Sequence, residues 1–290
     1  MKQSARGLIE AALGGRKASG EPISAHRLFE HAFQEGTAPD RSLLLWGEDF
    51  PDCQYERIEL EHFHFSAKGK QPATNCWLWC PVGSWSAIRA VVKFAAPKPI
   101  KDCNFYFFRV PAPTSKIRFT LRGDNQTAVL FSERIMRFNA TMVDAGNTLT
   151  IGENTYIGGG ELSLGRTTVT IAAGGLWSDG VLLQGTDSHG IVDLDTMRII
   201  NNVPKHITLK RRVWLGRGAS VMKNVTIEEG AIVGAAALVV KDVPKACAVA
   251  GIPAKVIKER VTWTQRRSVI MDDEKQYILR LRNEMKSSAE

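Results

Sequence analysis

A six-residue repeat constrains this chain more than any other feature of its sequence. From Leu209 onward an aliphatic residue recurs at every sixth position, and a small or β-branched residue follows four positions after each one. The aliphatic set is Leu209, Leu215, Val221, Ile227, Val233 and Val239, and the second set is Val213, Ala219, Val225, Ala231, Ala237 and Val243. An α-helix needs a period of about 3.6 residues and a half-buried strand a period of about two. The repeat fits neither.

The repeat instead predicts a three-sided coil. Each hexad forms one short strand and one tight corner, and three hexads complete a turn. The aliphatic residues point inward and stack on their counterparts about 4.8 Å away along the axis. The second set fills the corners, where long side chains do not fit. Stacked coils bury a continuous core, as in other solenoids.

A weaker block of the same repeat precedes the first. Its inward positions are Ile151, Ile157, Ile171, Trp177 and Leu183, with a two-residue slip near 163–166 and with Gly175 and Val181 at corners. Between the two blocks, residues 186–206 break the repeat. We expect a loop that leaves the coil there, and loops on a rigid scaffold commonly carry function.

The sequence upstream of about residue 124 contains no hexads. Residues 25–33 are compatible with a helix, and 58–65 and 104–110 with strands. We therefore expect an N-terminal cap domain of mixed or mainly β structure at 1–123, a β-helix domain at 124–258, and a tail at 259–290. The tail contains a charged, helical stretch at 272–286 that packs on the coil or on a neighbouring subunit.

Composition narrows the partners and the compartment. The formal charge is +8, but the basic residues are scattered among 30 acidic ones, and no nucleic-acid motif is present. A phosphorylated coenzyme or an acidic glycan suits such a charge equally well. No apolar run approaches the ~20 residues of a membrane span, and the first residues do not resemble a signal peptide. Five cysteines do not make a disulfide framework, so the expected location is cytoplasmic.

Several motifs resemble the bacterial polysaccharide O-acetyltransferases of the hexapeptide-repeat class. They are Leu176-Trp177-Ser178-Asp179-Gly180-Val181, Gly185-Thr186-Asp187-Ser188-His189-Gly190-Ile191, Arg198-Ile199-Ile200-Asn201, Val213-Trp214-Leu215-Gly216, Val239-Val240-Lys241-Asp242-Val243-Pro244 and Ala250-Gly251-Ile252-Pro253-Ala254-Lys255-Val256-Ile257. The similarity covers roughly 139–258. It implies a left-handed parallel β-helix, an acetyl-CoA-dependent O-acetyltransferase acting on a sugar or polysaccharide, and a homotrimer with active sites between subunits.

His189 is the first candidate catalytic residue. Acyl transfer to a hydroxyl needs a base that takes the proton as the oxygen attacks the thioester carbonyl, and imidazole titrates near neutral pH. In the resembled family the matching histidine is that base. Asp187, with Asp193 as the alternative, is the candidate to hold the second imidazole nitrogen. A solvated loop carboxylate is the competing interpretation for Asp187.

Coenzyme A needs a smooth channel for its pantetheine arm and cations for its phosphates. By resemblance, Trp214, Gly216, Gly234, Ala235 and Ala236 line the arm, and Lys241, Lys255 and Lys258 meet the nucleotide end. The glycine and alanine positions also lie at corners, where any residue must be small. Trp214 precedes an inward aliphatic and is expected to point outward, whereas Trp177 is expected in the core. The family often has Asn at the position of Ile252.

No covalent intermediate is indicated, because the chain has no Gly-x-Ser-x-Gly elbow. We expect direct attack in a ternary complex. Cys76 and Cys80, with Cys53, Cys103, His62 and His64, have poor zinc-ligand spacing, so no metal is expected. The aromatic residues Trp77, Trp79, Trp85, Phe105, Tyr106, Phe107 and Phe108 fit strand core better than a sugar-binding platform.

Two other functions remain open at the level of sequence. One is the same chemistry on nitrogen, which would acetylate an amino sugar or a nucleotide-linked sugar. The other is a β-helix scaffold without catalysis, against which His189, Lys241 and Lys255 argue. The N-terminal region is the expected place for acceptor selectivity.

Overall fold

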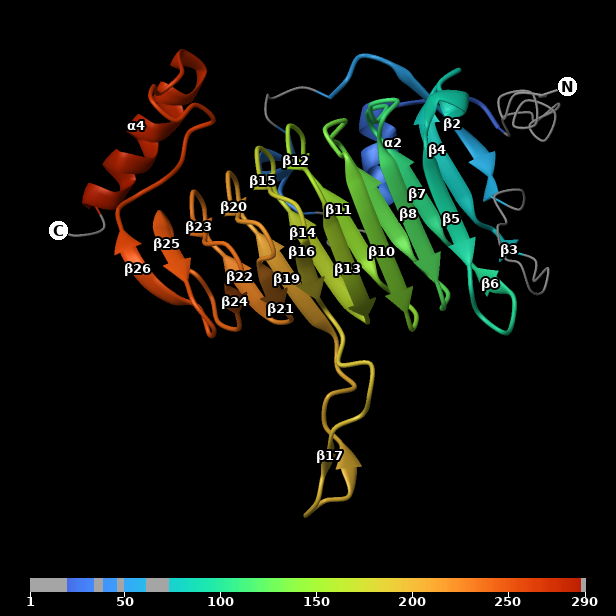
Figure 1. Cartoon of the computed structure of the whole chain (residues 1–290). Helices are drawn as coiled ribbons and strands as arrows, with labels where there is room; N and C mark the ends of the chain where they lie inside the picture. Colours follow the sequence, from blue (N-terminus) through green and yellow to red (C-terminus); the bar gives the residue numbers. More distant parts are fainter. Residues whose placement is uncertain (1–19, 34–38, 46–49, 61–72, 288–290) are drawn as a thin grey trace, which may run out of the picture.

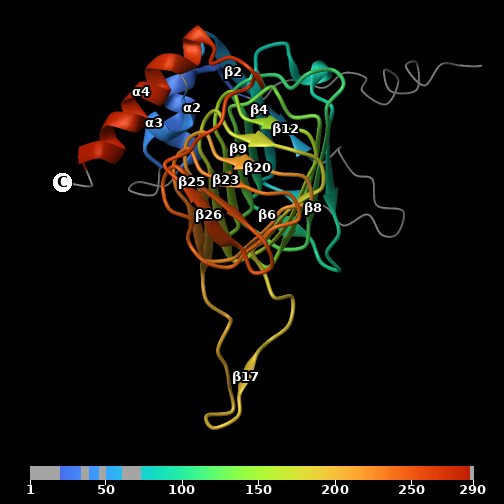
Figure 2. The ribbon, with the colours of Figure 1, turned by 60° about the vertical axis from the view of Figure 1, so that its left-hand side comes forward.

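The computed structural model describes residues 20–33, 39–45, 50–60 and 73–287. Most of them form a three-sided parallel β-helix, whose stacked coils are seen side-on in Figure 1. In Figure 2 the coils superimpose as one closed outline, and a long arm extends away from it. Along each coil the chain runs through face 1, face 2 and face 3, separated by three corners.

Each face is one sheet of neighbouring coils. Face 1 consists of β4 (Trp77–Pro81), β7 (Asn104–Phe107), β9 (Thr127–Leu130), β11 (Thr148–Ile151), β14 (Thr167–Ile171), β19 (Lys205–Leu209) and β22 (Val225–Ile227). Face 2 consists of β12 (Tyr156–Ile157), β15 (Leu176–Trp177), β20 (Trp214–Leu215), β23 (Ile232–Val233), β25 (Cys247–Ala250) and the antiparallel β26 (Lys255–Glu259). Face 3 consists of β5 (Ala90–Phe94), β8 (Lys116–Leu121), β10 (Arg137–Val143), β13 (Gly160–Gly165), β16 (Val181–Gln184), β21 (Ser220–Met222) and β24 (Leu238–Val239).

The inward positions predicted from the hexads are confirmed. Both sets of the strong block, aliphatic and corner, are at most 2% exposed. The weaker block is equally buried, and Trp177 stacks in register with Leu215 and Val233 of the next two coils. Because each inward side chain lies directly over its counterpart, the apolar interior is continuous along the axis.

The coil begins earlier than the sequence predicted. Trp77 pairs in parallel with Asn104, Asn104 with Thr127, and Thr127 with Thr148, so successive coils shorten along the chain. The downstream coils are shorter still, since Trp214 pairs with Ile232, which lies three hexads further along the chain. The longer early coils do not divide into three hexads, and this hides the repeat. Residues 77–123 therefore belong to the β-helix and not to a separate cap.

Aromatic side chains fill the interior of the early coils. The Phe105 and Phe119 rings lie 4.8 Å apart, and Phe119 and Phe138 lie 6.1 Å apart, between centroids. Phe105, Phe119 and Phe138 are fully buried in the same core cluster. Phe105 and Phe107 of the predicted aromatic stretch are thus strand core, whereas Trp79, Tyr106 and Phe108 are buried on the outer side of face 1 and Trp77 and Trp85 are partly exposed. The strand predicted at 104–110 is β7, which ends at Phe107.

A small N-terminal cap covers the outer side of face 1. It contains β1 (Ile23–Ser24), α2 (Ala25–Ala32), α3 (Arg41–Leu44) and β2 (Gln54–Glu59), which pairs antiparallel with β4. Leu28 and Phe29 of α2 pack against outward aromatics such as Phe108 and Phe131, whose rings stack 4.2 Å apart. The helix predicted at 25–33 is therefore confirmed. Residues 61–65 of the predicted strand lie outside the described residues.

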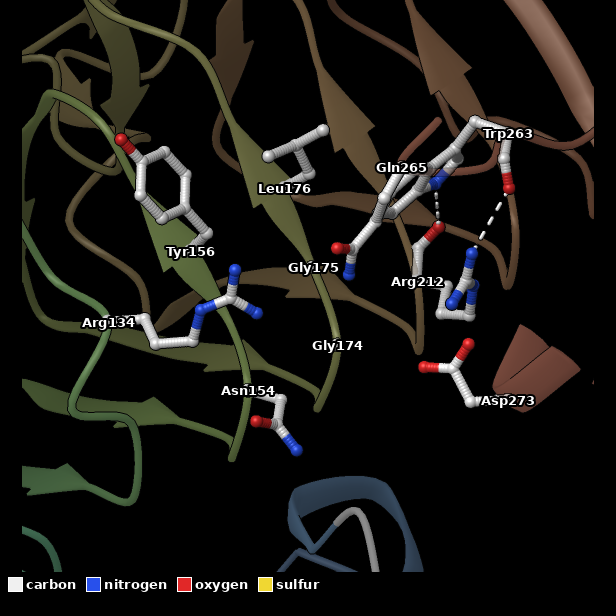
Figure 3. Close-up of a pocket in the computed structure, with 10 residues that line it drawn as sticks. All are labelled: Arg134, Asn154, Tyr156, Gly174, Gly175, Leu176, Arg212, Trp263, Gln265 and Asp273. Atoms are coloured by element: carbon white, nitrogen blue, oxygen red, sulfur yellow. Dashed lines mark hydrogen bonds between the residues drawn. The ribbon is translucent and has the colours of Figure 1, made fainter. Parts of the chain in front are cut away.

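The C-terminal tail packs against the last coils, as predicted. Its helix α4 (Asp272–Ser287) is anchored by a buried ion pair, in which Arg212 Nη2 donates to Glu274 Oε1 at 2.7 Å. Trp263 adds two bonds, donating from Nε1 to Arg212 O and accepting from Arg212 Nη2 (Figure 3). Within the described residues, no helix is long and apolar enough to cross a membrane.

Candidate active site

The predicted loop leaves the β-helix at the corner between faces 3 and 1. Ser220 pairs with Leu238 on the next coil, at the ordinary spacing of three hexads. Its partner on the preceding coil, Leu182, lies about twice as far away along the chain, because the loop is inserted between them. The insertion forms the arm that projects in Figures 1 and 2. It contains an antiparallel pair, β17 (Val192–Asp193) and β18 (Arg198–Ile199), and Asp193 Oδ1 closes its turn by accepting from Thr196 N and Oγ1 at 2.7 Å.

The base of this arm rests on a buried polar ladder. Asn147 Nδ2 donates to Gln126 Oε1 at 2.9 Å, and Asn147 Oδ1 accepts from Thr167 N at 2.9 Å. Thr167 Oγ1 in turn donates to Gly185 O at 2.8 Å. Gly185 is the last residue before the chain leaves the coil. All three ladder residues are fully buried. Hydrogen bonds inside the β-helix thus fix the position at which the loop leaves it.

The amide side chain of Asn201 hydrogen-bonds to the residues around His189 and holds them in place. Asn201 Nδ2 donates to Asp187 Oδ2 and to His189 O, both at 2.8 Å, and Asn201 Oδ1 accepts from Ile191 N at 2.8 Å. Asn201 lies on the returning side of the arm, so these bonds tie its outgoing and returning segments together. Ser188 has a φ of 62°, a left-handed conformation that turns the chain sharply before His189.

Asp187 is held by two partners other than the imidazole. Its carboxylate accepts hydrogen bonds from Lys223, one coil further along the same corner, and from Asn201. The Lys223 bond, followed by the Asn201 bond, lowers the pKa of Asp187 below its ordinary value. Within the described residues neither carboxylate oxygen bonds the His189 ring. The contact expected between Asp187 and imidazole is therefore not formed in this chain, and Asp193 lies instead at the turn of the arm.

The His189 side chain is exposed in an open cleft of about 370 Å³. Charged side chains of both signs line this cleft, namely Arg122, Asp144, Asp187 and Lys205. Lys205 is buried except for 8% of its surface and donates from Nζ to Val203 O at 3.0 Å. The arrangement can place an imidazole nitrogen beside a bound hydroxyl in a cleft that cations also line.

The small residues expected to line the pantetheine group of coenzyme A lie at a different corner from the His189 loop. Gly216 and Gly234 occupy equivalent positions on successive coils, between faces 2 and 3. A Cβ on Gly216 would lie 2.7 Å from Ala235 N, so close stacking of the coils alone requires glycine there. Ala235 and Ala236 are exposed. These four residues therefore lie together at one corner of the coil.

Trp214 points outward from face 2, as predicted, and is half-buried between Leu176 and Ile232. Its ring centroid lies 6.3 Å from that of Trp263 in the tail. The three lysines are exposed but separated. Lys255 and Lys258 lie on β26 at the end of face 2, whereas Lys241 follows β24 at the same corner as the His189 loop.

A single chain therefore does not bring the two groups of candidates together. The His189 loop lies where face 3 ends, and Gly216, Gly234 and Ala235 lie where it begins. A strand of the length of β16 spans about 13 Å, which separates the two edges. The roles of Asn201, Lys223 and the Asn147 ladder are not predictable from a local sequence pattern. Continuing the hexad register across the insertion would have placed Lys223 near Asp187.

The Cys and His residues considered as zinc ligands form no zinc site within the part of the chain that the structure describes. No group of three or more His, Cys, Asp or Glu side chains lies within reach of one ion in the described ranges. Cys76 and Cys103 occupy adjacent coils, and each thiol donates to a backbone carbonyl, Cys76 Sγ to Thr74 O at 3.5 Å and Cys103 Sγ to Lys101 O at 3.4 Å. His62 and His64 lie outside the described residues.

A second hollow, of about 470 Å³, lies where the tail meets the corner between faces 1 and 2 (Figure 3). Arg134 and Tyr156 form one side, and Trp263 and Gln265 of the tail form the other. The Arg134 guanidinium lies 5.7 Å from the Tyr156 ring centroid. His189 does not line this hollow, which we interpret as the junction between tail and coil.

Sequence comparison relates part of this chain to known acetyltransferases. It is 35% identical over 133 residues to polysialic acid O-acetyltransferase of Escherichia coli O1:K1 / APEC, covering 45% of this chain and 43% of that protein. It is 31% identical over 114 residues to galactoside O-acetyltransferase of Escherichia coli (strain K12), covering 39% and 55%. The match thus spans about half the length of each relative. No protein-family model matches the chain.

The fold is also found among solved structures. The crystal structure of the polySia specific acetyltransferase NeuO superposes with a TM-score of 0.52 and 23% identity, covering 73% of this chain and 92% of that one. At this identity the likeness is evidence of fold alone. It confirms the predicted fold class, a left-handed parallel β-helix with a C-terminal helix.

Proposed function

We propose that this chain, whose repeat region is homologous to the hexapeptide-repeat acetyltransferases, transfers an acetyl group from acetyl-CoA to a hydroxyl of a cell-surface polysaccharide. The observation that carries the proposal is the exposed imidazole of His189, on a loop that Asn201 and the buried Asn147 ladder hold at a fixed corner. Free cysteines suit a cytoplasmic location, to which we assign the reaction.

The mechanism is direct transfer in a ternary complex. The acceptor hydroxyl oxygen attacks the thioester carbonyl carbon while an imidazole nitrogen of His189 takes the hydroxyl proton. The ester bond forms, the carbon–sulfur bond breaks, and the proton passes to the leaving thiolate to give free coenzyme A. Asp187 acts as a positioning residue, because its bonds to Lys223 and Asn201 fix the loop that carries the base.

The coenzyme lies along the edge between faces 2 and 3. Trp214, Gly216, Gly234, Ala235 and Ala236 line its pantetheine arm, where exposed backbone and small side chains allow close approach. Lys255 and Lys258 supply cations for its phosphates from the chain that carries this edge, and Lys241, which lies at the corner of the His189 loop, supplies one from the neighbouring chain. All three lysines are exposed, so their ammonium groups are accessible to a ligand.

The active unit is a homotrimer in this proposal, because one chain separates the base from the coenzyme edge by the width of face 3. The arm supplies the means of association. Leu194 and Met197 at its tip are 83% and 75% exposed. Other large apolar residues of the arm are also exposed, namely Ile191, Val192, Ile199, Ile200 and Val203. Such a concentration of exposed apolar surface marks a site of protein association.

The test is the release of free thiol from acetyl-CoA with purified bacterial polysaccharides and amino sugars as acceptors. We expect turnover with a hydroxyl acceptor and a loss of about 10²–10⁴-fold in kcat for His189→Ala. His26→Ala, which changes an exposed histidine of the cap, is the matched control. Unchanged turnover in His189→Ala would overturn the mechanism, and transfer only to amino groups would replace the acceptor class.

A further inference from the structure

We propose that a groove on the outer side of face 1 binds sugar residues of the acceptor chain that flank the acetylated one. This inference rests on the proposed function and assigns a location to acceptor recognition. The groove has a volume of about 680 Å³ and lies between face 1 and the end of α2. No residue assigned to catalysis or to the coenzyme lines it.

The floor of the groove is a column of polar side chains in register. Asn104, Thr127, Thr148 and Thr168 pair in succession across four neighbouring coils and face outward. All four are at least partly exposed. Three steps between strands make the column about 14 Å long, which exceeds a single sugar ring. Each coil thus offers one hydroxyl or amide group at a regular interval.

The wall of the groove is aromatic and comes from the cap. His31 and Phe33 of the α2 end line it together with Tyr106 from β7. His31 Nδ1 lies 3.0 Å from Tyr106 Oη, and the Phe33 ring lies 5.0 Å from that of Phe29, between centroids. These contacts hold the wall in place. Part of the Phe33 side chain remains exposed for contact with a ligand.

The groove adjoins the His189 cleft around the corner of the β-helix between faces 3 and 1. The corner after β8 supplies Arg122 to the cleft and Asn125 to the groove, and the corner after β10 supplies Asp144 and Gly146 in the same way. Lys205 of the cleft pairs with Thr167, next to Thr168 of the groove. A chain bound along the column would therefore continue toward the imidazole.

The chemistry of the lining favours a glycan over a nucleic acid. Hydroxyls and amides donate and accept hydrogen bonds with sugar hydroxyls, while an aromatic ring packs on the apolar face of a pyranose. None of the described residues that line the groove is Lys or Arg. A nucleic acid would need such cations for its phosphates, so this groove does not suit one.

The experiment measures binding separately from catalysis. Full-length His189→Ala protein is run by affinity electrophoresis in gels that each contain one purified bacterial polysaccharide. We expect retardation by at least one polymer, and roughly tenfold or greater weakening in the triple variant Thr127→Val, Thr148→Val, Thr168→Val, because it removes three hydroxyl partners. Thr168→Trp, which fills the groove, should weaken binding as strongly.

The matched control is Thr170→Val with Thr208→Val, which removes two outward hydroxyls of the same face outside the groove. In the active chain, the triple variant should raise KM for the polymer without raising KM for acetyl-CoA. Retardation by no polymer, or retardation that both groove variants leave unchanged, would overturn the proposal. The electrophoresis requires no acetyl transfer, so failure of the proposed function leaves its result interpretable.

Discussion

Asn201 is the residue on which the geometry of the candidate base depends most directly. Its side chain makes three hydrogen bonds that join the two ends of the arm, one of them to the backbone of His189. We expect Asn201→Ala to lower kcat/KM by about 10²-fold, because small displacements of a catalytic group are costly. Asn202→Ala is the control, since the Asn202 side chain bonds the exposed Arg166. Equal kinetics in the two variants would contradict this role.

The Asp187 carboxylate predicts a pH dependence of stability. Its bonds to Lys223 and Asn201 place its folded-state pKa below the ordinary value of 3.8. The stabilisation is therefore complete above that ordinary value and is lost as pH falls through the lower, folded-state value. Urea midpoints measured from neutral to strongly acidic pH should fall less steeply at the acid end for Asp187→Asn than for the unchanged chain. Parallel curves would show that the ion pair contributes nothing.

Single residues were predictable where one local rule decided them. Trp177 occupies an inward hexad position and is fully buried, and His189 lies on the long break between the two blocks of the repeat. The partners of Asp187 were not predictable in this way. Lys223 is 36 residues away in sequence, and only the stacking of complete coils brings it beside the carboxylate.

At the level of elements, the number of residues in a coil decides whether its strands can be predicted from the sequence. A coil of three hexads repeats the same three strand and corner positions, so its hexads are visible in the sequence. The coils near Asn104 are longer and unequal in length, with six- or seven-residue strands such as β8 and β10. Their inward residues are as well stacked, but no fixed period marks them.

The stacked inward side chains predict large and local effects of truncation. Leu215 is fully buried between Trp177 and Val233 of the neighbouring coils. Leu215→Ala should lower the free energy of unfolding by about 2–5 kcal/mol, because it leaves a cavity in a close-packed core. Ser220→Ala, on the outer side of the same coil, should change it by less than about 0.5 kcal/mol. Urea unfolding of the two variants measures both values.

The tail stabilises the whole molecule by closing the last coils. Glu274 and Arg212 are each 2% exposed at the side chain, so their ion pair is buried. Glu274→Leu should lower the free energy of unfolding by about 3–5 kcal/mol, since breaking a buried pair leaves a charge poorly solvated. Asp272→Leu removes an exposed partner of Lys275 on the same helix and should cost far less. Similar losses from both variants would contradict the anchoring role of the pair.

The arrangement of the whole molecule makes its strongest prediction about assembly. The base and the coenzyme edge lie on opposite sides of face 3, and the exposed apolar arm offers a way to bring copies together. Light scattering should give a mass of about 96 kDa, three times the 32.0 kDa chain. Leu194→Glu combined with Met197→Glu should give the single-chain mass and little transfer. An unchanged mass would remove the arm from the interface.

A mixing experiment tests whether copies share the active site. His189→Ala removes the base, and Ala235→Trp obstructs the coenzyme edge, so each variant alone should be inactive. If each site takes His189 from one copy and Ala235 from another, trimers assembled from both variants contain some intact sites. Activity should therefore appear when the two proteins are unfolded and refolded together, but not when they are refolded apart and combined. If co-refolding restores nothing, each chain must hold its own base and coenzyme, and the width of face 3 would then argue against His189 as the base.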